Sequence, residues 1–159
     1  MLRLAVLPDL DFVYKLYMHP EVNPFLLYEP MDKQSFVPIF TNLLQAGVKY
    51  IYTSGELKTG MCKLVPLQHR NNHVVYLGGV AIDPACSGKG EGSKLLQEII
   101  LFAGEKGFLR IELSVASINS RAISLYEKAG FQQEGMLRKL TYLKSEDRFL
   151  DEVIMSYLY

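Results

Sequence analysis

Three glycines at alternate positions, Gly88, Gly90 and Gly92, are the residues of this chain whose type and spacing most directly indicate chemistry. Glycine leaves the backbone amide uncovered and free to adopt positive φ. Successive amides of this kind form a concavity that attracts oxyanions. A periodic segment that begins near Ser93 predicts a helix, whose N-terminus adds unpaired N–H groups at the same place. The pattern therefore predicts a phosphate-binding turn at residues 87–92.

Two charged residues alternate with these glycines. Lys89 should strengthen the positive field of the turn, and Glu91 should oppose it unless its carboxylate points to solvent. The spacing argues against two common nucleotide-binding motifs. No run supplies G-x-x-x-x-G-K-[ST], and the third glycine of a G-x-G-x-x-G motif counted from Gly88 falls on Ser93. A glycine-rich surface turn without a ligand is the structural alternative.

The elements around the turn form a recognisable unit. An apolar segment, Tyr76 to Ile82, leads into it and stops at Asp83-Pro84. The helix that follows is expected to end at Gly107, and the alternating segment 109–115 predicts another strand. A strand, a helix of this length and a second strand favour a right-handed crossover between parallel strands. The turn would then lie inside a βαβ unit. The apolar face of the helix comprises Leu95, Leu96, Ile99, Ile100, Phe102 and Ala103.

A second informative segment runs from Asn119 to Gly130. Asn119 can cap a helix at its N-terminus and Gly130 can end it. Tyr126 follows Asn119 by seven residues, which is two helical turns or ~10 Å along one side of the helix. On spacing alone, Tyr126 is a core aromatic residue. Three residues share its face: Ala122, Leu125 and Ala129.

The remaining segments complete the expected order of elements. Proline and aromatic residues fill 18–30, which predicts an ordered loop rather than a helix. Asp32 is a plausible N-cap for the second helix, although Pro38 lies inside it and suggests a kink or a later start. The other segments are a strand at 2–6, helices at 10–17 and 32–47, strands at 49–53 and 60–66, and a closing hairpin of 131–144 with 148–158.

Length and composition limit the function. The chain has 159 residues, 49% of them hydrophobic, which fits a single domain over residues 1–159. Seventeen basic and seventeen acidic residues balance, so the net charge gives no attraction to nucleic acid or to an anionic membrane. The composition therefore predicts neither of these partners, and an acidic ligand must be held locally.

Cysteine and histidine usage gives two further expectations. Cys62 and Cys86 are the only cysteines and no signal peptide is apparent, which predicts reduced thiols and a cytoplasmic location. His69 and His73 have no nearby carboxylate or thiol to complete a metal site. We therefore predict no metal.

Two of these segments resemble motifs of the GNAT superfamily of N-acetyltransferases. Residues 87–92 (SGKGEG), after VAIDP, resemble its motif A, Q/R-x-x-G-x-G/A, with Ser87 in place of the opening Gln or Arg and Glu91 in place of an apolar residue. The segment NSRAISLYEKAGF at 119–131 resembles the family's next motif. The segment 135–158 resembles the closing hairpin of the branch that acetylates ribosomal-protein N-termini and small amines. The resemblance covers residues 76–158 well and the first 75 loosely.

The resemblance implies a fold and a co-substrate. The fold would be α/β (α+β): a single mixed, mostly antiparallel seven-stranded sheet with a central parallel βαβ pair and about four helices. Acetyl-CoA would bind with its pyrophosphate on the turn and its pantetheine along the strand that ends at Ile82, and Tyr126 would act as general acid toward the departing thiolate. The cofactor-binding residues so implied are Val80, Ala81, Ile82, Ser87, Gly88, Lys89, Gly90, Glu91, Gly92, Ser93, Asn119 and Tyr126.

The general base is left open by the sequence. In family members with a carboxylate base on the fifth strand, that residue lies five positions before the helix-capping Asn, which is Ser114 here. A serine cannot serve as the base by itself. We expect a water relay or a carboxylate from elsewhere, with Glu29 and Glu112 as candidates. Glu112 also fits an ion-pair partner or a solvated strand residue.

The acceptor would enter between the aromatic loop and the closing hairpin. The residues predicted to contact it are Phe25, Tyr28, Ser114 and Tyr142, and these side chains fit ordinary packing equally well. The resemblance implies an acetyl-CoA-dependent N-acetyltransferase that acts on a peptide N-terminus or a small-molecule amine, with a slight lean toward the peptide. The alternative is a catalytically silent acyl-CoA-binding module of the same fold. A homodimer through the closing hairpins is a further expectation.

Overall fold

The computed structural model describes all 159 residues, and its centre is one mixed sheet of seven strands in the order β1-β2-β3-β4-β5-β7-β6. Only β4 and β5 pair in parallel, and every other neighbouring pair is antiparallel. The strands are β1 (Leu2–Leu4), β2 (Lys49–Ser54), β3 (Leu57–Pro66), β4 (Val74–Ile82), β5 (Arg110–Ala116), β6 (Gln132–Leu143) and β7 (Arg148–Leu158). The predicted fold class is confirmed.

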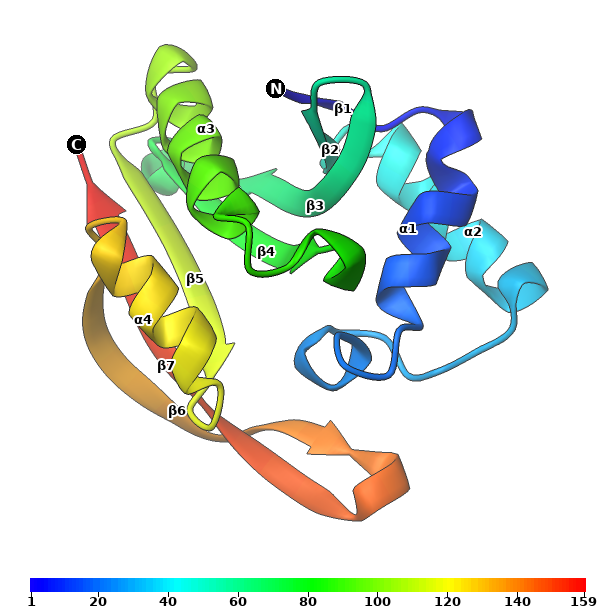
Figure 1. Ribbon diagram of the computed structural model, residues 1–159. Coiled ribbons are helices and arrows are strands. Elements are labelled where there is room, and N and C mark those ends of the chain that lie inside the picture. The colour runs from blue at the N-terminus through cyan, green and yellow to red at the C-terminus, as the bar shows by residue number, and fades with distance from the viewer.

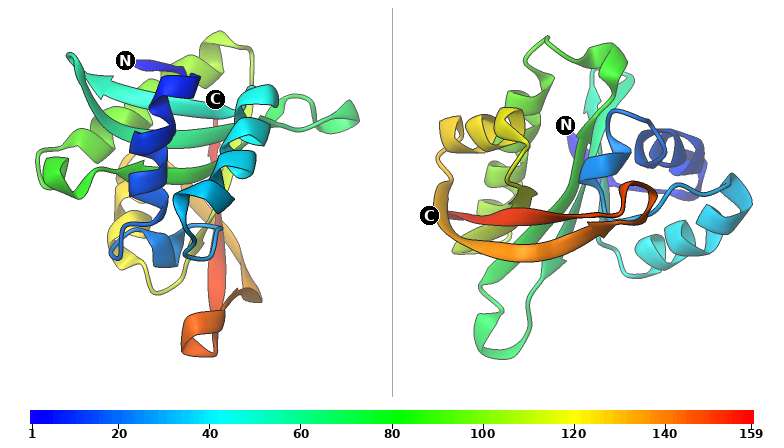
Figure 2. Two further views of the ribbon diagram at one scale, coloured as in Figure 1. Left: turned by 90° about the vertical axis from the view of Figure 1, so that its right-hand side faces the viewer. Right: turned by 90° about the horizontal axis from the view of Figure 1, so that it is seen from below.

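Four helices cover the two faces of this sheet (Figures 1 and 2). They are α1 (Leu10–Tyr17), α2 (Lys33–Gln45), α3 (Glu91–Glu105) and α4 (Ser120–Lys128). Figure 2 shows α3 and α4 on one side and α1 and α2 on the other. Each side has its own buried core, one around Leu95 and Ile99 of α3, and one around Phe36 and Phe40 of α2.

Side chains at the helix ends explain where two of these helices begin. Asp32 accepts a hydrogen bond from the backbone N–H of Ser35 at 2.8 Å, and Asn119 accepts one from the N–H of Ala122 at 3.2 Å. Both predicted caps are confirmed, since each satisfies an amide that the first helical turn leaves free. Pro38 lies inside α2 and does not delay its start. Helix α3 begins two residues earlier than predicted, because Gly90 caps it in the left-handed conformation.

The two central strands, β4 and β5, separate part-way along their length. β4 and β5 pair at three positions only, from Val74 with Arg110 to Tyr76 with Glu112, so residues 77–82 of β4 have no partner on β5. On its other side β4 carries a bulge, where Gly79 and Val80 lie opposite the single residue Cys62 of β3. A bulge bends its strand, and bulges are common next to active sites. The result is a wedge-shaped opening between β4 and β5.

Two further element boundaries, those of β1 and β3, differ from the sequence expectation. The first strand ends at Leu4 rather than near residue 6, because a short 3-10 turn at Leu7–Asp9 follows. Strand β3 begins at Leu57 rather than Gly60, since its first residues pair with the end of β2 across the Gly55 turn. None of the helices has the length and apolar character needed to cross a membrane.

Candidate active site

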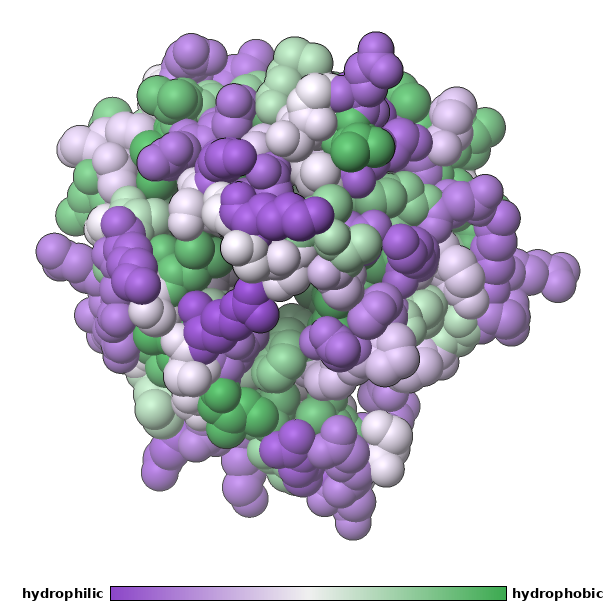
Figure 3. Space-filling model, viewed as in Figure 1, coloured by the Kyte–Doolittle hydropathy of each residue, from purple (hydrophilic) through white to green (hydrophobic).

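A groove of about 580 Å³ lies where the glycine-rich turn, the end of β4 and the first turns of α4 meet. The space-filling view shows it as a hollow near the middle of that face, with hydrophilic residues at its rim (Figure 3). Its walls combine main chain from β4 and the turn with side chains from α4 and the loop after α1. The lining residues from the turn and β4 are Val80, Ala81, Ile82, Ser87, Gly88, Gly90, Glu91, Gly92 and Ser93.

The turn has the open backbone that its glycines predicted. Gly88 and Gly90 have φ values of +78° and +76°, in the region that favours glycine, and no atom lies within 4 Å of where a Cβ would stand on either. Both positions therefore offer uncovered main chain to the groove. At Gly92 a Cβ would stand 3.1 Å from Cδ2 of Leu125, so this glycine lets α3 and α4 approach each other. The N-terminus of α3, which has 15 residues, lies at the same point.

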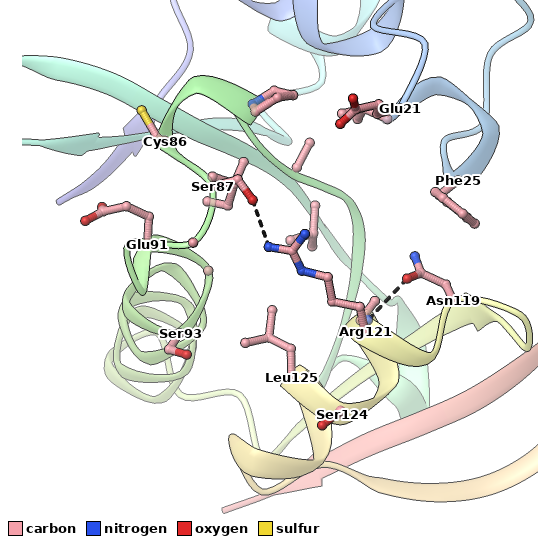
Figure 4. A pocket seen from close by; sticks show the side chains of 18 of the residues that line it. Glu21, Phe25, Cys86, Ser87, Glu91, Ser93, Asn119, Arg121, Ser124 and Leu125 are labelled. Carbon is pink, nitrogen blue, oxygen red and sulfur yellow. Dashed lines mark hydrogen bonds between the residues drawn. The ribbon is translucent and has the colours of Figure 1, made fainter.

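Helix α4 contributes the cationic side of the groove. Arg121 reaches across it, and its Nη2 donates a hydrogen bond to Oγ of Ser87 at 2.7 Å (Figure 4). Lys128 lines the same groove two turns farther along the helix. Arg121, Leu125 and Lys128 follow the i, i+4, i+7 spacing of one helix face. That spacing was visible in the sequence, but nothing there showed that this face would meet the turn.

The charged side chains of two predicted binding residues, Lys89 and Glu91, lie differently from what the sequence predicted. Lys89 is not among the lining residues, and its exposed Nζ donates to the carbonyl of Ala85 at 3.4 Å. The Glu91 carboxylate does not point to solvent: Glu91 is only 8% exposed, Lys94 donates to its Oε1 at 2.8 Å, and its Oε2 has no partner. Figure 4 shows its side chain turned away from Arg121. The hydrogen bond from Lys94 lowers the pKa of this carboxyl.

Tyr126 is buried beneath the groove rather than in its lining. It follows Leu125, whose side chain lines the groove, and its ring packs edge-on against Phe131 with centroids 5.7 Å apart. Only 8% of the residue is exposed. Burial raises the pKa of its hydroxyl, and the neighbouring Cys62 and Tyr76 add to the effect. The hydroxyl is therefore protonated at neutral pH, as a proton donor must be.

The wedge between β4 and β5 contains a chain of hydrogen bonds on the face opposite α3 and α4. The hydroxyls of Tyr76 and Ser114 lie 3.1 Å apart. Ser114 Oγ also donates to Oε2 of Glu152 on β7. The other oxygen of the same carboxylate, Glu152 Oε1, accepts from Thr141 Oγ1 on β6 at 2.6 Å. Glu152 was not among the candidate site residues predicted from the sequence. Alternation along β7 puts Glu152 and Ser156 on one face, but the strand pairing that brings Glu152 to Ser114 is a tertiary feature.

The family model described as "Acetyltransferase (GNAT) family" matches residues 10–131 of the chain. The chain belongs to this family. Its predicted resemblance to GNAT proteins is thereby confirmed over most of its length.

Several GNAT proteins and one uncharacterized protein are similar to parts of this chain. The N-alpha-acetyltransferase RimI of Mycobacterium tuberculosis is 34% identical over 70 residues, and the [Ribosomal protein bS18]-alanine N-acetyltransferase of Escherichia coli K12 is 32% identical over 80. An uncharacterized protein of Mycobacterium leprae is 37% identical over 97 residues. The matches cover 44%, 50% and 61% of this chain and only 42%, 53% and 26% of these relatives' own lengths, in that order.

Solved GNAT structures have the same fold along the whole chain. The spermidine N-acetyltransferase from Vibrio cholerae, solved in complex with CoA and spermine, superposes with a TM-score of 0.86 at 21% identity and covers 99% of this chain and 94% of that one. The ribosomal-protein-alanine N-acetyltransferase from Brucella melitensis gives a TM-score of 0.82 at 21% identity, with 100% and 99% covered. At these identities the likeness shows the GNAT fold alone.

Glu112 and Glu29, the two candidates for the general base, lie apart from the hydrogen bonds that link Tyr76, Ser114 and Glu152. Glu112, on the same face of β5, accepts from Arg110 at 3.2 Å. Arg110 also forms an ion pair with Glu134 of β6, so Glu112 shares its cation with a second carboxylate. Glu29 is exposed and lines a different, smaller cavity.

That smaller cavity, of about 50 Å³, lies between the aromatic loop and the closing hairpin, where the acceptor was expected. Tyr28, Glu29 and Tyr142 line it. Tyr142 donates to Oδ1 of Asp147 at 2.6 Å and stacks on Phe149, so its position is fixed by the hairpin. Phe25 lines the larger groove instead. The structure thus divides the predicted acceptor residues between the two hollows and places Ser114 in the wedge.

Proposed function

We propose that this chain transfers an acetyl group from acetyl-CoA directly to a primary amine. The observation that carries the proposal is the continuity of the groove, which joins the glycine turn to the unpaired end of β4 above Tyr126. A diphosphate, an extended thioester arm and a proton donor would thus meet in one crevice. Membership of the GNAT family supports the same conclusion.

The groove fits the co-substrate in charge and shape. The pyrophosphate would take the space that is open above Gly88 and Gly90, at the positive end of α3. Arg121 and Lys128 would add cationic side chains, and an arginine can hold two phosphate oxygens at once. The pantetheine arm would pair with Val80–Ile82 as an added strand, since this edge of β4 has no partner on β5. Asn119 would lie beside the arm, although its Oδ1 is already used as the helix cap.

Two groups at the end of the groove, a backbone amide of β4 and the Tyr126 hydroxyl, would then assist the transfer. Acetyl-CoA supplies the acetyl group as a thioester. An amide of β4 near the bulge would donate to the thioester oxygen and stabilise the negative charge that develops there. Tyr126 would give its proton to the departing sulfur, whose thiol has an ordinary pKa near ~8.5. Neither Cys62 nor Cys86 would act as a nucleophile in this proposal. The acetyl group would therefore pass directly from the sulfur of acetyl-CoA to the amine nitrogen, without an acyl-enzyme intermediate.

The acceptor is a primary amine of a peptide N-terminus or of a small molecule. The relatives named for ribosomal-protein alanine and the structural relative bound to spermine support these two classes. We favour a peptide, because the N-alpha-acetyltransferase and the ribosomal-protein-alanine N-acetyltransferase match over 70 and 80 residues. Relatives named for phosphinothricin, mycothiol and thialysine match over only 57 or 58 residues. Ser114, at the position of the family's base, gives some support to the alternative of a silent acyl-CoA-binding module.

Replacement of the proton donor separates an enzyme from a silent module. Tyr126→Phe should lower kcat by about 10²-fold, because it removes the hydroxyl and keeps the ring that packs on Phe131. Release of free thiol from acetyl-CoA, measured with a panel of peptide and small amines, reports the rate. Binding of coenzyme A should be unchanged. If the native chain binds coenzyme A but releases no thiol with any amine in the panel, the silent module is favoured.

A further inference from the structure

We propose that Tyr76, Ser114 and Glu152 form a proton relay that takes the proton from the acceptor's ammonium group. The inference rests on the proposed function and assigns the base that the sequence leaves open. In it, the carboxylate comes from β7 and acts through two hydroxyls, instead of projecting from β5 itself. Glu152 is a positioning residue in this scheme, because it reaches the amine only through Ser114 and Tyr76.

The hydrogen bonds give the relay a direction. Ser114 has one O–H, which it donates to Oε2 of Glu152. The 3.1 Å contact between Tyr76 and Ser114 must then be a bond that Tyr76 donates. Each hydroxyl therefore donates toward the carboxylate. When the oxygen of Tyr76 accepts a proton, Tyr76 can pass its own proton to Ser114, and Ser114 can pass its own to Glu152.

The free end of this relay lies in the wedge. Tyr76 is the last residue of β4 that pairs with β5. Its ring lies along the strand over Gly78, where a Cβ would stand only 3.1 Å from Cε1 of Tyr76. The hydroxyl is thereby held near the point where the two strands separate.

The charges around the relay leave Glu152 available. Its two carboxylate oxygens accept from the hydroxyls of Ser114 and Thr141, and neither bond brings a positive charge. Arg110, Glu112 and Glu134 lie on the same face and neutralise one another in part, as two ion pairs that share the arginine. Lys63 of β3 lies on this face as well, beside the Tyr76 ring: its Cε is 3.5 Å from the Cβ position of Gly78. Burial lowers the pKa of Lys63, which favours its neutral form next to the relay. Neither oxygen of the Glu152 carboxylate is paired with a cation, which suits the approach of an ammonium group.

The proton balance of the step is complete within the named groups. The ammonium group gives a proton to Tyr76 Oη, Tyr76 gives its own to Ser114, and Ser114 gives its own to Glu152. The amine, now neutral, forms the new N–C bond as the C–S bond breaks. Tyr126 supplies a proton to the sulfur, and the second proton of the attacking nitrogen restores Tyr126. Glu152 then releases its proton to water.

Kinetics over a range of pH test the relay. The rate of thiol release is measured from pH 6.5 to about 9.5, with whichever of two probes the native enzyme uses faster, a short peptide with a free N-terminus or a linear polyamine. At pH 7, Tyr76→Phe and Glu152→Gln should each lower kcat/KM by about 10²-fold. This loss of kcat/KM relative to the native enzyme should become smaller as the pH approaches the pKa of the amine, ~8 for an α-amine, because more of the amine is then already neutral when it binds. The double variant should be no slower than either single one.

Three variants serve as controls. Glu112→Gln removes a carboxylate on the same face that has an arginine partner, and its pH profile should match that of the native enzyme. Ser114→Glu in the Glu152→Gln background should restore activity at pH 7, because it places a carboxylate directly in the wedge. Ser114→Ala removes the hydroxyl that links Tyr76 to Glu152 but keeps the carboxylate. It tests the relay even if Glu152→Gln does not fold.

The outcomes separate the relay from the proposed function. Native kcat/KM in both Glu152→Gln and Ser114→Ala would overturn the relay, and so would a deficit of the same size at every pH, which indicates a structural role. Each relay variant should bind coenzyme A as the native chain does in calorimetry. If the native chain binds coenzyme A but releases no thiol with either probe, the proposed function fails and the relay fails with it.

Discussion

Lys49 has an ammonium group that is buried without an acidic partner. The residue is 1% exposed, its Nζ donates to Tyr17 Oη at 3.3 Å, and it lies 4.7 Å from the centre of the Tyr17 ring. A hydroxyl and an aromatic face replace only part of the hydration that the charge loses. Burial lowers the pKa of Lys49 to about 7, with Cys62 and Lys63 as its titratable neighbours. Folding thus costs this side chain its charge over part of the neutral range.

The consequence is a stability that rises with pH. Above about pH 7 the folded state releases the Lys49 proton, whereas the unfolded chain keeps it up to ~10.4. The unfolded state then binds more protons, so the free energy of unfolding should increase with pH by up to about 1.4 kcal/mol per unit in this range. Lys49→Met should raise stability at pH 7 and flatten this slope. Urea unfolding at pH 7, 8 and 9 measures both, and an equally steep slope in Lys49→Met would contradict the assignment.

Strand β4 depends on a single glycine for its bulge. Gly79 has a φ of +56°, and a Cβ there would stand 3.0 Å from Tyr17 Oη and 3.7 Å from Lys49 Nζ. An alanine would therefore meet both a strained backbone and a filled space. The bulge bends β4 at the place where the pairing with β5 has ended, so the wedge and the buried Tyr17–Lys49 contact are linked through this position.

Replacement of two glycines separates the strain from the contact. Gly55, in the turn between β2 and β3, has a similar φ of +62° but no atom within 4 Å of a Cβ. Gly55→Ala should cost about 1 kcal/mol from backbone strain, and Gly79→Ala about 2–3 kcal/mol because crowding is added. Chemical denaturation of both variants at one pH gives the comparison. Equal losses would mean that the space around Gly79 adjusts and that the bulge is not held by this contact.

At the scale of the whole molecule, local signals predicted most of the fold. Apolar periodicity, the Asp32 and Asn119 caps and the glycines after α3 and α4 are properties of neighbouring residues, and they gave the order of elements. The family resemblance added the sheet, which the structure confirms. The boundaries at β1, β3 and α3 differed because turns and strand pairing decide them.

The site was predictable only where it is local in sequence. The turn of Gly88 to Gly92 is one segment, and its shape follows from its residues. Arg121 and Ser87 are 34 positions apart, and Ser114 and Glu152 are 38 apart, so their contacts depend on how α4 and β7 are placed. Lys89 bonds back to the carbonyl of Ala85, only four residues away, and this depends on the shape of the turn between them.

Calorimetric titration of coenzyme A into the native chain and two variants tests whether the glycine turn and Arg121 hold the phosphates of the co-substrate. Arg121 bridges the groove and Lys89 does not line it, so the two cations form a matched pair near the same turn. We predict binding by the native chain, binding weakened by about 10-fold or more in Arg121→Ala through loss of a phosphate contact, and native affinity in Lys89→Ala. Absence of binding by the native chain, or an Arg121→Ala variant that binds as tightly as the native chain, would contradict the account.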